Sequence, residues 1–389
     1  LNMTNKTHPI RVLTVYDGFF SGGTRIVHTG LIIYLHKNRQ QEHRVLSIFD
    51  KVQRDHTIQT MEDDSCYKKL KKAGIHISTL GKYTHQGRHF SEDEIQQAQK
   101  EIDQADVVIS LKEQPLLLIQ HLNLGNKPLV VCLHRSDPES QGPGVGILAS
   151  IVKQRPEDTL VISCSDSGRV AYNNAIGSSS VKFIPNGIDL NKFHPSKTKN
   201  KQIRKELKIP YYANVIIFSG RFDDVKDIPL FIASLREYCK ISKTKPHIIM
   251  CGAGMTKENK VLIDIIRSSP IGAKVHLLGI QHKMADLYCA ADIVALTSTT
   301  EAYPLCLLEG MACGAVPVAT DVGDCRDIVG EYGYITSHEP KDIATAWEKA
   351  LINKHELHIK TMIRIDKFDY KYMIQKYSYA IQNVSKDTR

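Results

Sequence analysis

The chain has 389 residues, of which 42% are hydrophobic and 24% charged, and its formal net charge is +9 at pH 7. This composition is typical of a soluble globular protein that is long enough to form two hydrophobic cores. No run of about 18 uncharged apolar residues occurs, and no basic segment followed by an apolar stretch opens the chain, so the sequence predicts neither a membrane span nor a secretory signal.

The nine cysteines show no C-x-x-C spacing and their number is odd, which favours a reducing, cytoplasmic location. The positive charge favours anionic partners such as phosphorylated substrates, anionic lipid headgroups or nucleic acid. The basic residues are spread along the chain without a nucleic-acid motif, so we expect no nucleic-acid partner. Peripheral association with the inner face of a membrane and an ordinary solvated surface both remain open.

Short apolar runs alternate with amphipathic helical stretches in the first half of the chain, a pattern typical of parallel strands joined by helices. Strands are predicted at residues 10–15, 44–49, 107–110, 129–133, 160–164 and 181–184. The pattern restarts in the second half, with strands predicted at residues 215–219, 247–251, 275–279, 293–296 and 315–319.

Between the halves, the turn residues 185–189 lead into a Lys-rich connector. We therefore predict an N-terminal domain, 1–187, and a C-terminal domain, 188–367. The amphipathic, Tyr-rich segment 368–384 predicts a helix, so that 368–389 crosses back to the first domain. Two doubly wound α/β units would face each other across a cleft at the carboxyl ends of their strands, where such sheets bind ligands.

Two carboxylates, Glu301 and Glu309, flank a predicted turn that runs into an apolar helix. One would lie in the loop and the other on the helix, an arrangement that suits a sugar nucleotide. Gly314 then ends the helix, and a buried strand follows.

The segment 219–227 follows a predicted strand and contains Arg221 and Lys226. A guanidinium fork and an ammonium near a helix start could balance the charge of a diphosphate. The alternative is an ion pair between Lys226 and Asp223 or Asp224; the downstream glutamates favour the phosphate interpretation.

A glycine pair, Gly22 and Gly23, links the first strand to a predicted helix. Backbone N–H groups at such a helix start can face an anion. A tight strand-to-helix turn would use the same residues, and neither a G-x-G-x-x-G nor a Walker sequence occurs in the chain.

Five groups of residues in this chain occur in the order found in one family of enzymes. They are Gly22-Gly23, the segment 185–189, Gly220-Arg221 with Lys226, the segment 251–254, and Glu301 with Glu309. With these motifs the chain resembles the retaining GT-B glycosyltransferases of family four (glycosyl transferases group 1). The resemblance spans nearly the whole chain and is most specific in the C-terminal half. It implies two Rossmann-like domains facing a deep interdomain cleft, with the acceptor in the first domain and the donor in the second.

The resemblance also implies residue roles. Glu309 would accept hydrogen bonds from the ribose, Glu301 would contact the transferred sugar, and His134 would lie beside that sugar, with capping of a strand end as its alternative role. Pro304 stands where many family members have Gly, which removes a backbone donor near the sugar. The implied catalytic set is His134, Glu301, Arg221 and Lys226, and the implied donor-binding set is Gly22, Gly23, Arg221, Lys226, Gly252, Gly254, Ile280, Tyr303, Leu305, Cys306 and Glu309.

The expected reaction is transfer of a sugar from a UDP- or GDP-sugar to a hydroxyl acceptor, lipid-linked or polymeric, with retention of configuration, in cell-envelope or other glycoconjugate biosynthesis. Because Arg221 and Lys226 supply positive charge and the acidic pairs of the chain are adjacent rather than spaced, we expect no metal and no cofactor. The alternative functions are those of another GT-B enzyme, a sugar-nucleotide epimerase or a phosphorylase, or of a non-catalytic glycan-binding subunit. The loop 141–146 would either shape the acceptor pocket or serve as a connection.

Overall fold

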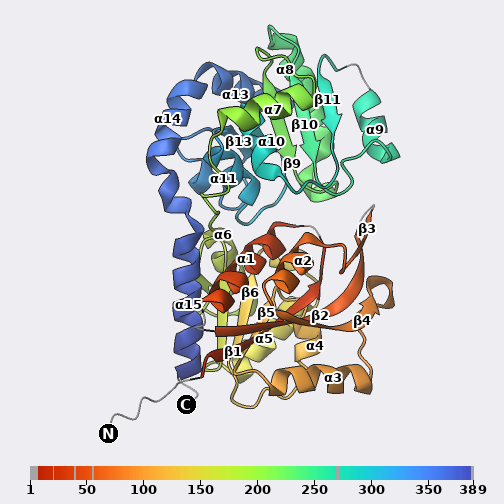
Figure 1. Ribbon diagram of the computed structural model, residues 1–389, viewed down its shortest axis with the longest axis vertical. Helices are drawn as coiled ribbons and strands as arrows, with labels where there is room; N and C mark the ends of the chain where they lie inside the picture. Colours follow the sequence, from red (N-terminus) through yellow and green to blue (C-terminus); the bar gives the residue numbers. More distant parts are fainter. Residues whose placement is uncertain (1–7, 21, 39–40, 55–56, 269–270, 387–389) are drawn as a thin grey trace.

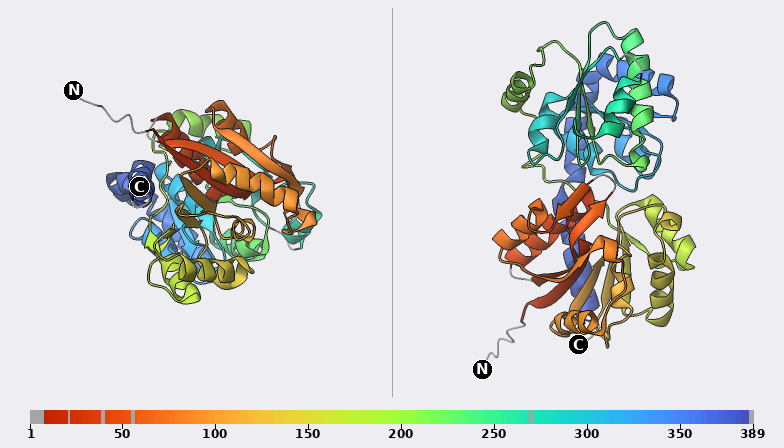
Figure 2. Two further views of the ribbon diagram at one scale, coloured as in Figure 1. Left: turned by 90° about the horizontal axis from the view of Figure 1, so that it is seen from below. Right: turned by 90° about the vertical axis from the view of Figure 1, so that its right-hand side faces the viewer.

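A computed structural model describes residues 8–20, 22–38, 41–54, 57–268 and 271–386. Two α/β domains are stacked along the long axis of the molecule, and the C-terminal helix runs back along the side of the first domain (Figure 1). The views from below and from the side show that each domain is built around its own sheet (Figure 2).

The first domain contains a sheet that joins eight strands of the described chain in the order β3-β2-β1-β5-β6-β7-β8, with β4 also pairing with β2. All of its pairings are parallel except that between β2 and β3. The strands are β1 (Ile10–Gly18), β2 (Gln41–Arg54), β3 (Thr57–Thr60), β4 (His76–Tyr83), β5 (Val107–Leu111), β6 (Leu129–Leu133), β7 (Thr159–Ser163) and β8 (Lys182–Phe183).

Helices cover both faces of this sheet, which is why its central strands β5 and β6 are fully buried and, apart from Ser110, apolar. Along β1, Val12 packs into the core on one face and Leu13 into the core on the other, as the period of two in a strand requires. The helices of this domain are α1 (Gly23–Lys37), α2 (Ser65–Lys72), α3 (Glu92–Asp103), α4 (Leu116–Ile119), α5 (Gly144–Gln154) and α6 (Asp166–Ile176).

The second domain contains a fully parallel sheet in the order β11-β10-β9-β12-β13-β14. This order reverses direction between β9 and β12, and the loops that follow these two strands therefore diverge and leave a crevice. The strands are β9 (Val215–Ser219), β10 (His247–Cys251), β11 (Lys274–Leu277), β12 (Ile293–Leu296), β13 (Val316–Thr320) and β14 (Tyr334–Thr336). The helices are α7 (Lys197–Glu206), α8 (Ile228–Ile241), α9 (Lys260–Arg267), α10 (Met284–Ala290), α11 (Leu305–Ala312), α12 (Cys325–Val329), α13 (Pro340–Ile352) and α14 (Lys354–Arg364).

Two crossing segments connect the domains. The N–H of Ile188 donates to the carbonyl of Phe368 at 2.9 Å, and the N–H of Tyr370 donates to the carbonyl of Ile188 at 2.9 Å. After this crossing, α15 (Tyr370–Lys386) places Met373, Tyr377 and other apolar side chains in the core of the first domain. The proposed boundary at 187/188 lies within the crossing, and residues 387–389 of the proposed returning segment lie outside the described residues.

Each strand expected from the sequence is present, with ends that shift by up to a few residues. Three strands were missed, β3, β4 and β14. β3 is polar and only half-buried, β4 is partly exposed and β14 has three residues, so none carries a strong apolar signal. β3 forms an antiparallel hairpin with β2. In the described part of the chain, no helix is both long and apolar enough to cross a membrane.

Candidate active site

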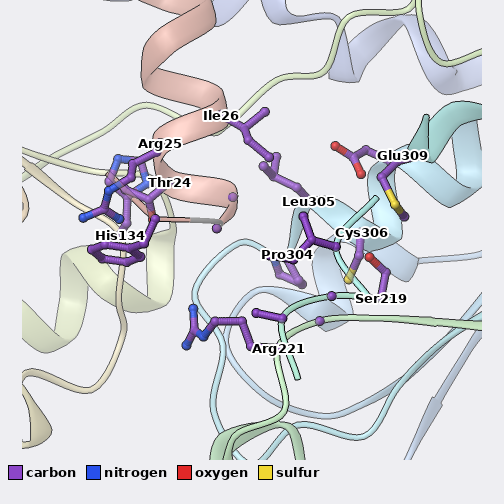
Figure 3. A pocket seen from close by; sticks show the side chains of 18 of the residues that line it. Thr24, Arg25, Ile26, His134, Ser219, Arg221, Pro304, Leu305, Cys306 and Glu309 are labelled. Carbon is purple, nitrogen blue, oxygen red and sulfur yellow. The ribbon is translucent and has the colours of Figure 1, made fainter. Parts of the chain in front are cut away.

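A cavity of about 680 Å³ lies between the carboxyl ends of the two sheets. Loops that follow β1, β5 and β6 line it from the first domain, and loops that follow β9, β10, β11 and β12 line it from the second. Its volume is within the range of about 300–1,000 Å³ that is usual for small-molecule sites. Figure 3 shows residues of both domains facing this space.

Two helices begin at the cavity, one from each domain. Gly22 precedes α1 and Pro304 precedes α11, and neither helix start is capped by a side chain. The two starts also touch, since a Cβ added to Gly23 would lie 3.1 Å from the Leu305 side chain. Uncapped N–H groups and the positive ends of two helix dipoles therefore converge on one place, which is a suitable environment for an anion.

Arg221 reaches the same place from the loop after β9 (Figure 3). Its Nη2 donates to Oδ2 of Asp223 at 2.5 Å, and the other oxygen of Asp223 accepts from the backbone N–H of Lys226 at 3.1 Å. The buried Nε of Arg221 has no hydrogen-bond partner among the described residues. Asp223 thus orients the guanidinium while leaving it capacity to bind an additional acceptor atom.

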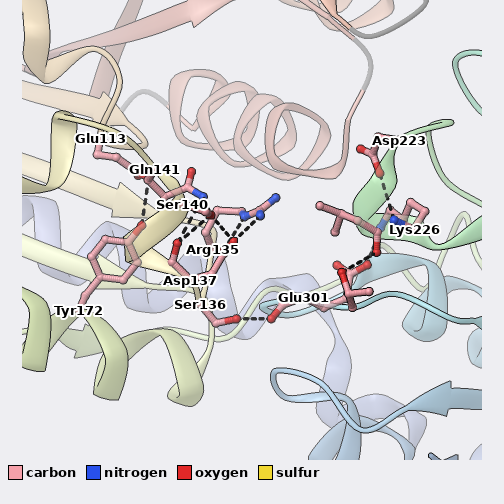
Figure 4. A network of polar contacts seen from close by, with 12 residues as sticks. Glu113, Arg135, Ser136, Asp137, Ser140, Gln141, Tyr172, Asp223, Lys226 and Glu301 are labelled. Atoms are coloured by element: carbon pink, nitrogen blue, oxygen red, sulfur yellow. Dashed lines mark hydrogen bonds and ion pairs between the residues drawn. The ribbon is translucent and has the colours of Figure 1, made fainter. Parts of the chain in front are cut away.

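Lys226 forms its ion pair with Glu301 rather than with Asp223 or Asp224, so that alternative interpretation was wrong (Figure 4). Ser298 Oγ donates to the same Glu301 oxygen at 2.7 Å. Burial lowers the pKa of Lys226, but the charge of Glu301, its hydrogen bond to Lys226 and the other acidic groups nearby together outweigh this effect, and the pKa is raised overall. Lys226 is therefore a fixed cation of the cavity wall at neutral pH.

Contacts across the cleft hold the two domains together near this network. The hydroxyl of Ser136 donates to the carbonyl of Glu301 (Figure 4). Asp324 of the second domain accepts from the backbone N–H groups of Asp166 and Ser167, at 2.7 and 2.9 Å. It thereby caps the start of α6 from the opposite domain.

Glu309 lies on α11 and lines the same cavity (Figure 3). Burial raises the pKa of Glu309 to about 7, although the charge of Lys192 counteracts this shift. A carboxylate in this environment is stabilised in its charged form when hydroxyl donors reach it.

His134 follows β6 and lies beside Arg25 in the first-domain wall (Figure 3). Burial lowers the pKa of His134 to about 3, and the charges of His28, Lys112 and Arg25 add to this effect. The imidazole is therefore neutral at neutral pH, able to donate or accept a hydrogen bond but not to supply a positive charge.

Gly252 and Gly254 lie in the loop after β10, both with positive φ, of 133° and 81°. A Cβ at Gly252 would lie 2.0 Å from the carbonyl oxygen of Gly220, so only glycine allows these two loops to pack together. Gly252 and Ile280 line the cavity, whereas Gly254 does not and instead packs against Phe222.

The structure thus brings the other residues of the implied catalytic and donor-binding sets into the lining of one cavity, Tyr303 and Cys306 included. It also places there several cations that the sequence interpretation missed, among them Arg25, Arg54 and Lys112. Lys112 directly follows β5 and Arg54 ends β2, so the carboxyl ends of their strands were the available signal. The segment 141–146 forms the start of α5 and does not line this cavity.

Comparisons with known proteins identify the second domain. The profile of the family described as glycosyl transferases group 1 matches residues 199–365. The second domain is therefore similar to the glycosyl transferases group 1 family. The chain is 30% identical over 192 residues to a D-inositol 3-phosphate glycosyltransferase of Streptosporangium roseum, a match that covers 44% of the chain and 43% of that relative. It is 27% identical over 161 residues to an N-acetyl-alpha-D-glucosaminyl L-malate synthase of Bacillus anthracis, covering 40% and 41%.

The match therefore spans less than half the length of these curated relatives. Solved structures extend the likeness to the whole fold. HepE of Anabaena, solved in complex with UDP-glucose, has a TM-score of 0.79 at 18% identity and covers 96% of this chain and 100% of its own. The glycosyltransferase WaaG has a TM-score of 0.71 at 15% identity, with coverage of 95% and 98%. The chain has the GT-B fold of two Rossmann-like domains.

Across the described ranges, no three His, Cys, Asp or Glu side chains form a group that could hold a metal ion. Asp64 caps α2 by accepting from the N–H groups of Cys66 and Tyr67, and Asp223 caps the turn at Lys226. These two acidic residues are thus engaged by backbone donors and arginine.

Proposed function

We propose that the protein transfers a sugar from a nucleotide diphosphate sugar to a hydroxyl acceptor, with retention of anomeric configuration. One observation carries the proposal: the starts of α1 and α11, Arg221 and Lys226 converge on a single interdomain cavity that also contains Glu309. The relatives named above support it, since one is named a glycosyltransferase and HepE was solved with UDP-glucose.

The donor would lie with its diphosphate between the two helix starts, where Arg221 and Lys226 add their charges. The carboxylate of Glu309 would accept the ribose hydroxyls, and the loop at Gly252 would hold the base. Glu301, already joined to Lys226, would present its second oxygen to the transferred sugar on the side that faces His134.

Charge separation defines what this site must stabilise. As the bond from the anomeric carbon to the diphosphate breaks, positive charge grows on the sugar and negative charge on the leaving phosphate. Arg221, Lys226 and the N–H groups of α1 and α11 are fixed where the negative charge develops, which is the arrangement that lowers such a barrier. The leaving phosphate could then take the proton of the acceptor hydroxyl on the same face, so that configuration is retained.

Reaction without a metal is part of the proposal, because the chain supplies four sources of positive potential at one point. Turnover should persist after dialysis against EDTA. Complete loss on chelation, with recovery on addition of magnesium, would contradict this part.

A panel of UDP- and GDP-sugars tests the donor assignment. A bound donor raises the melting temperature by mass action, and slow hydrolysis without acceptor should follow for the correct sugar. Arg221→Ala should abolish both effects. Arg326→Ala is the matched control, because Arg326 forms an exposed ion pair with Asp321 outside the cavity. Equal donor binding by both variants would argue against the proposed site.

A further inference from the structure

The cavity lining has two parts, a first wall formed by residues of the first domain and a second wall formed by residues of the second. One side chain outside this lining joins the two domains directly. Asp324, in the loop that follows β13, is only 3% exposed, and its carboxylate oxygens accept from the backbone N–H groups of Asp166 and Ser167, at 2.7 and 2.9 Å. These are the first two residues of α6, so the second domain completes the start of a first-domain helix.

The side chain of Asp324 is directed away from its own helix. Asp324 directly precedes α12, where an aspartate usually accepts from N–H groups of the helix that it precedes. It makes no such bond and caps α6 instead, where a carboxylate also interacts favourably with the helix dipole. Ser165 accepts from the N–H of Gly168, the third residue of α6, at 2.9 Å. The N–H groups at the start of α6 are therefore all satisfied within the protein in this arrangement of the domains.

The loop that carries Asp324 also packs on the segment that carries Glu301. The N–H of Asp324 donates to the carbonyl of Ala302 at 2.9 Å. A Cβ at Gly323 would lie 2.2 Å from the carbonyl oxygen of Glu301, and the φ of Gly323 is 54°, so only glycine allows this contact. The same carbonyl accepts from the hydroxyl of Ser136, in the loop that follows β6 (Figure 4). The backbone at Glu301 is thus held both by the first domain and by the loop of Asp324.

The start of α6 is packed in turn against the loop that carries His134. A Cβ at Gly168, in the first turn of α6, would lie 2.8 Å from the carbonyl oxygen of Arg135. His134 and Arg135 both line the first wall. Close contacts therefore run from the His134 loop through α6 and Asp324 to the backbone at Glu301, and they join the first wall to the second.

We propose that Asp324 is a positioning residue, which fixes Glu301 relative to His134 by capping α6 from the opposite domain. This inference rests on the proposed function, in which Glu301 contacts the transferred sugar on the side that faces His134. A misplacement of about 1 Å far from the chemistry can cost about 10² in rate. Loss of the contact should therefore lower turnover, whereas Arg221, Glu309 and the other groups proposed to bind the nucleotide keep their places within the second domain.

Asp166→Pro tests the contact from the side of the first domain. It removes one of the two N–H donors and leaves Asp324 in place. Proline suits the first position of a helix, and the residue before it, Ser165, already has the extended backbone that proline requires, with φ −135° and ψ 150°. Asp166→Ala is the matched control, because it keeps the N–H and removes only a largely exposed ion pair with Arg169.

Turnover of the donor by Asp166→Pro should fall about tenfold or more relative to Asp166→Ala, the usual effect of losing a hydrogen bond to a charged group. The affinity for UDP, measured by calorimetry, should change much less than turnover does. Asp324→Asn should act in the same direction, because an amide offers one acceptor atom where the carboxylate offers two. Asp327→Asn is its control, since Asp327 is an exposed acid of α12.

Hydrogen exchange provides a second readout that requires no ligand. The segment 299–304 contains Glu301, and its amide groups should exchange faster in Asp166→Pro than in Asp166→Ala, although the substitution lies in the other domain. A purely structural role within α6 would accelerate exchange at the start of α6 and leave this segment unchanged.

The outcomes separate this inference from the proposed function. Equal turnover by Asp166→Pro and Asp166→Ala, or equal losses of turnover and of UDP affinity, would refute the positioning role and leave the transferase proposal intact. If wild type neither binds UDP nor hydrolyses a UDP- or GDP-sugar, the proposed function fails. Faster exchange in the segment 299–304 would then still support the link between α6 and Glu301, and unchanged exchange would refute this link in either case.

Discussion

The two walls of the cleft stabilise their cations in different ways. In the second domain, Arg221 pairs with Asp223 and Lys226 pairs with Glu301. In the first domain, Arg25 and Lys112 have no such partner among the described residues, and Arg25 and Arg54 both lie against the ring of Phe20.

The difference is one of preorganisation. A paired cation has a defined position before any ligand arrives, which is what the stabilisation of a developing charge requires. Arg25 and Lys112, which lack such a partner among the described residues, are less stable without a ligand but gain more when an anion binds. We therefore associate the second wall, rather than the first, with the chemical step.

Removal of Lys226 should produce the largest effect. Lys226→Ala takes away one fixed charge at the leaving phosphate and leaves Glu301 without its cation, so turnover should fall by a factor of about 10² to 10³. The measurement is the rate of donor hydrolysis or transfer, with circular dichroism to confirm folding.

Lys240→Ala is the control for this change. Lys240 forms an exposed ion pair with Glu237 in the same domain and should be replaceable without loss of rate. A folded Lys226→Ala protein with wild-type turnover would remove Lys226 from the mechanism.

The sequence predicted the second wall better than the first for a physical reason. Arg221, Lys226, Glu301 and Glu309 each belong to a short loop or helix start whose residue pattern is local. Buried apolar strands precede these loops, and strand ends in a doubly wound sheet define where the loops meet. For the same reason, the fold class and most strands were predictable.

Contacts between distant segments were not predictable in this way. The alternative interpretation paired Lys226 with Asp223 or Asp224, but the partner of Lys226 is Glu301, which is 75 residues away. Asp223 is occupied by Arg221 and by a backbone N–H, and the loops after β9 and β12 adjoin at the point where the strand order reverses. The grouping of Arg25 and Arg54 around Phe20 likewise depends on the packing of β2 beside β1.

The titration of Glu309 tests whether every acid of the second wall is compensated by a cation. Its pKa is raised from 4.5 to about 7 by burial, so the folded protein holds this proton more tightly than the unfolded chain does. The corresponding stability is complete below pH 4.5 and is lost as the pH rises through 7. Because the side chain borders an open cavity, we reduce the full linkage value to about 1–2 kcal/mol.

Glu309→Gln should therefore match wild type in its free energy of unfolding near pH 4.5 and exceed it by that amount at pH 8. Urea denaturation at both pH values measures the difference. A constant difference across this range would show that Glu309 titrates normally and that the second wall has no uncompensated acid.

Lys112 gives the corresponding test for the first wall. Its pKa is lowered from 10.5 to about 8, so the folded protein loses this proton at a lower pH than the unfolded chain does. The free energy of unfolding should therefore rise between pH 8 and 10.5. In the absence of ligand at pH 7, Lys112→Gln should be more stable than wild type by about 1 kcal/mol, after allowance for partial exposure. This difference in stability between the two proteins should disappear toward pH 10. A less stable variant at pH 7 would mean that Lys112 is compensated within the protein, and the contrast between the walls would disappear.

Salt should produce the smallest effect and separates general repulsion from anion binding. A higher sodium chloride concentration screens the partly exposed cations of the first wall. The difference in free energy of unfolding between wild type and Lys112→Gln should therefore decrease by about 0.5 kcal/mol or less. Sodium sulfate at equal ionic strength screens equally, but sulfate carries two negative charges and binds more strongly than chloride to a cation such as Lys112. Wild type should therefore gain more from sulfate than Lys112→Gln does, and the variant corrects for the general stabilisation that sulfate gives to any protein. If both salts change the stability of both proteins equally, the cations of the first wall repel one another no more than those of an ordinary surface do. The position of these cations at the cavity would then need another explanation.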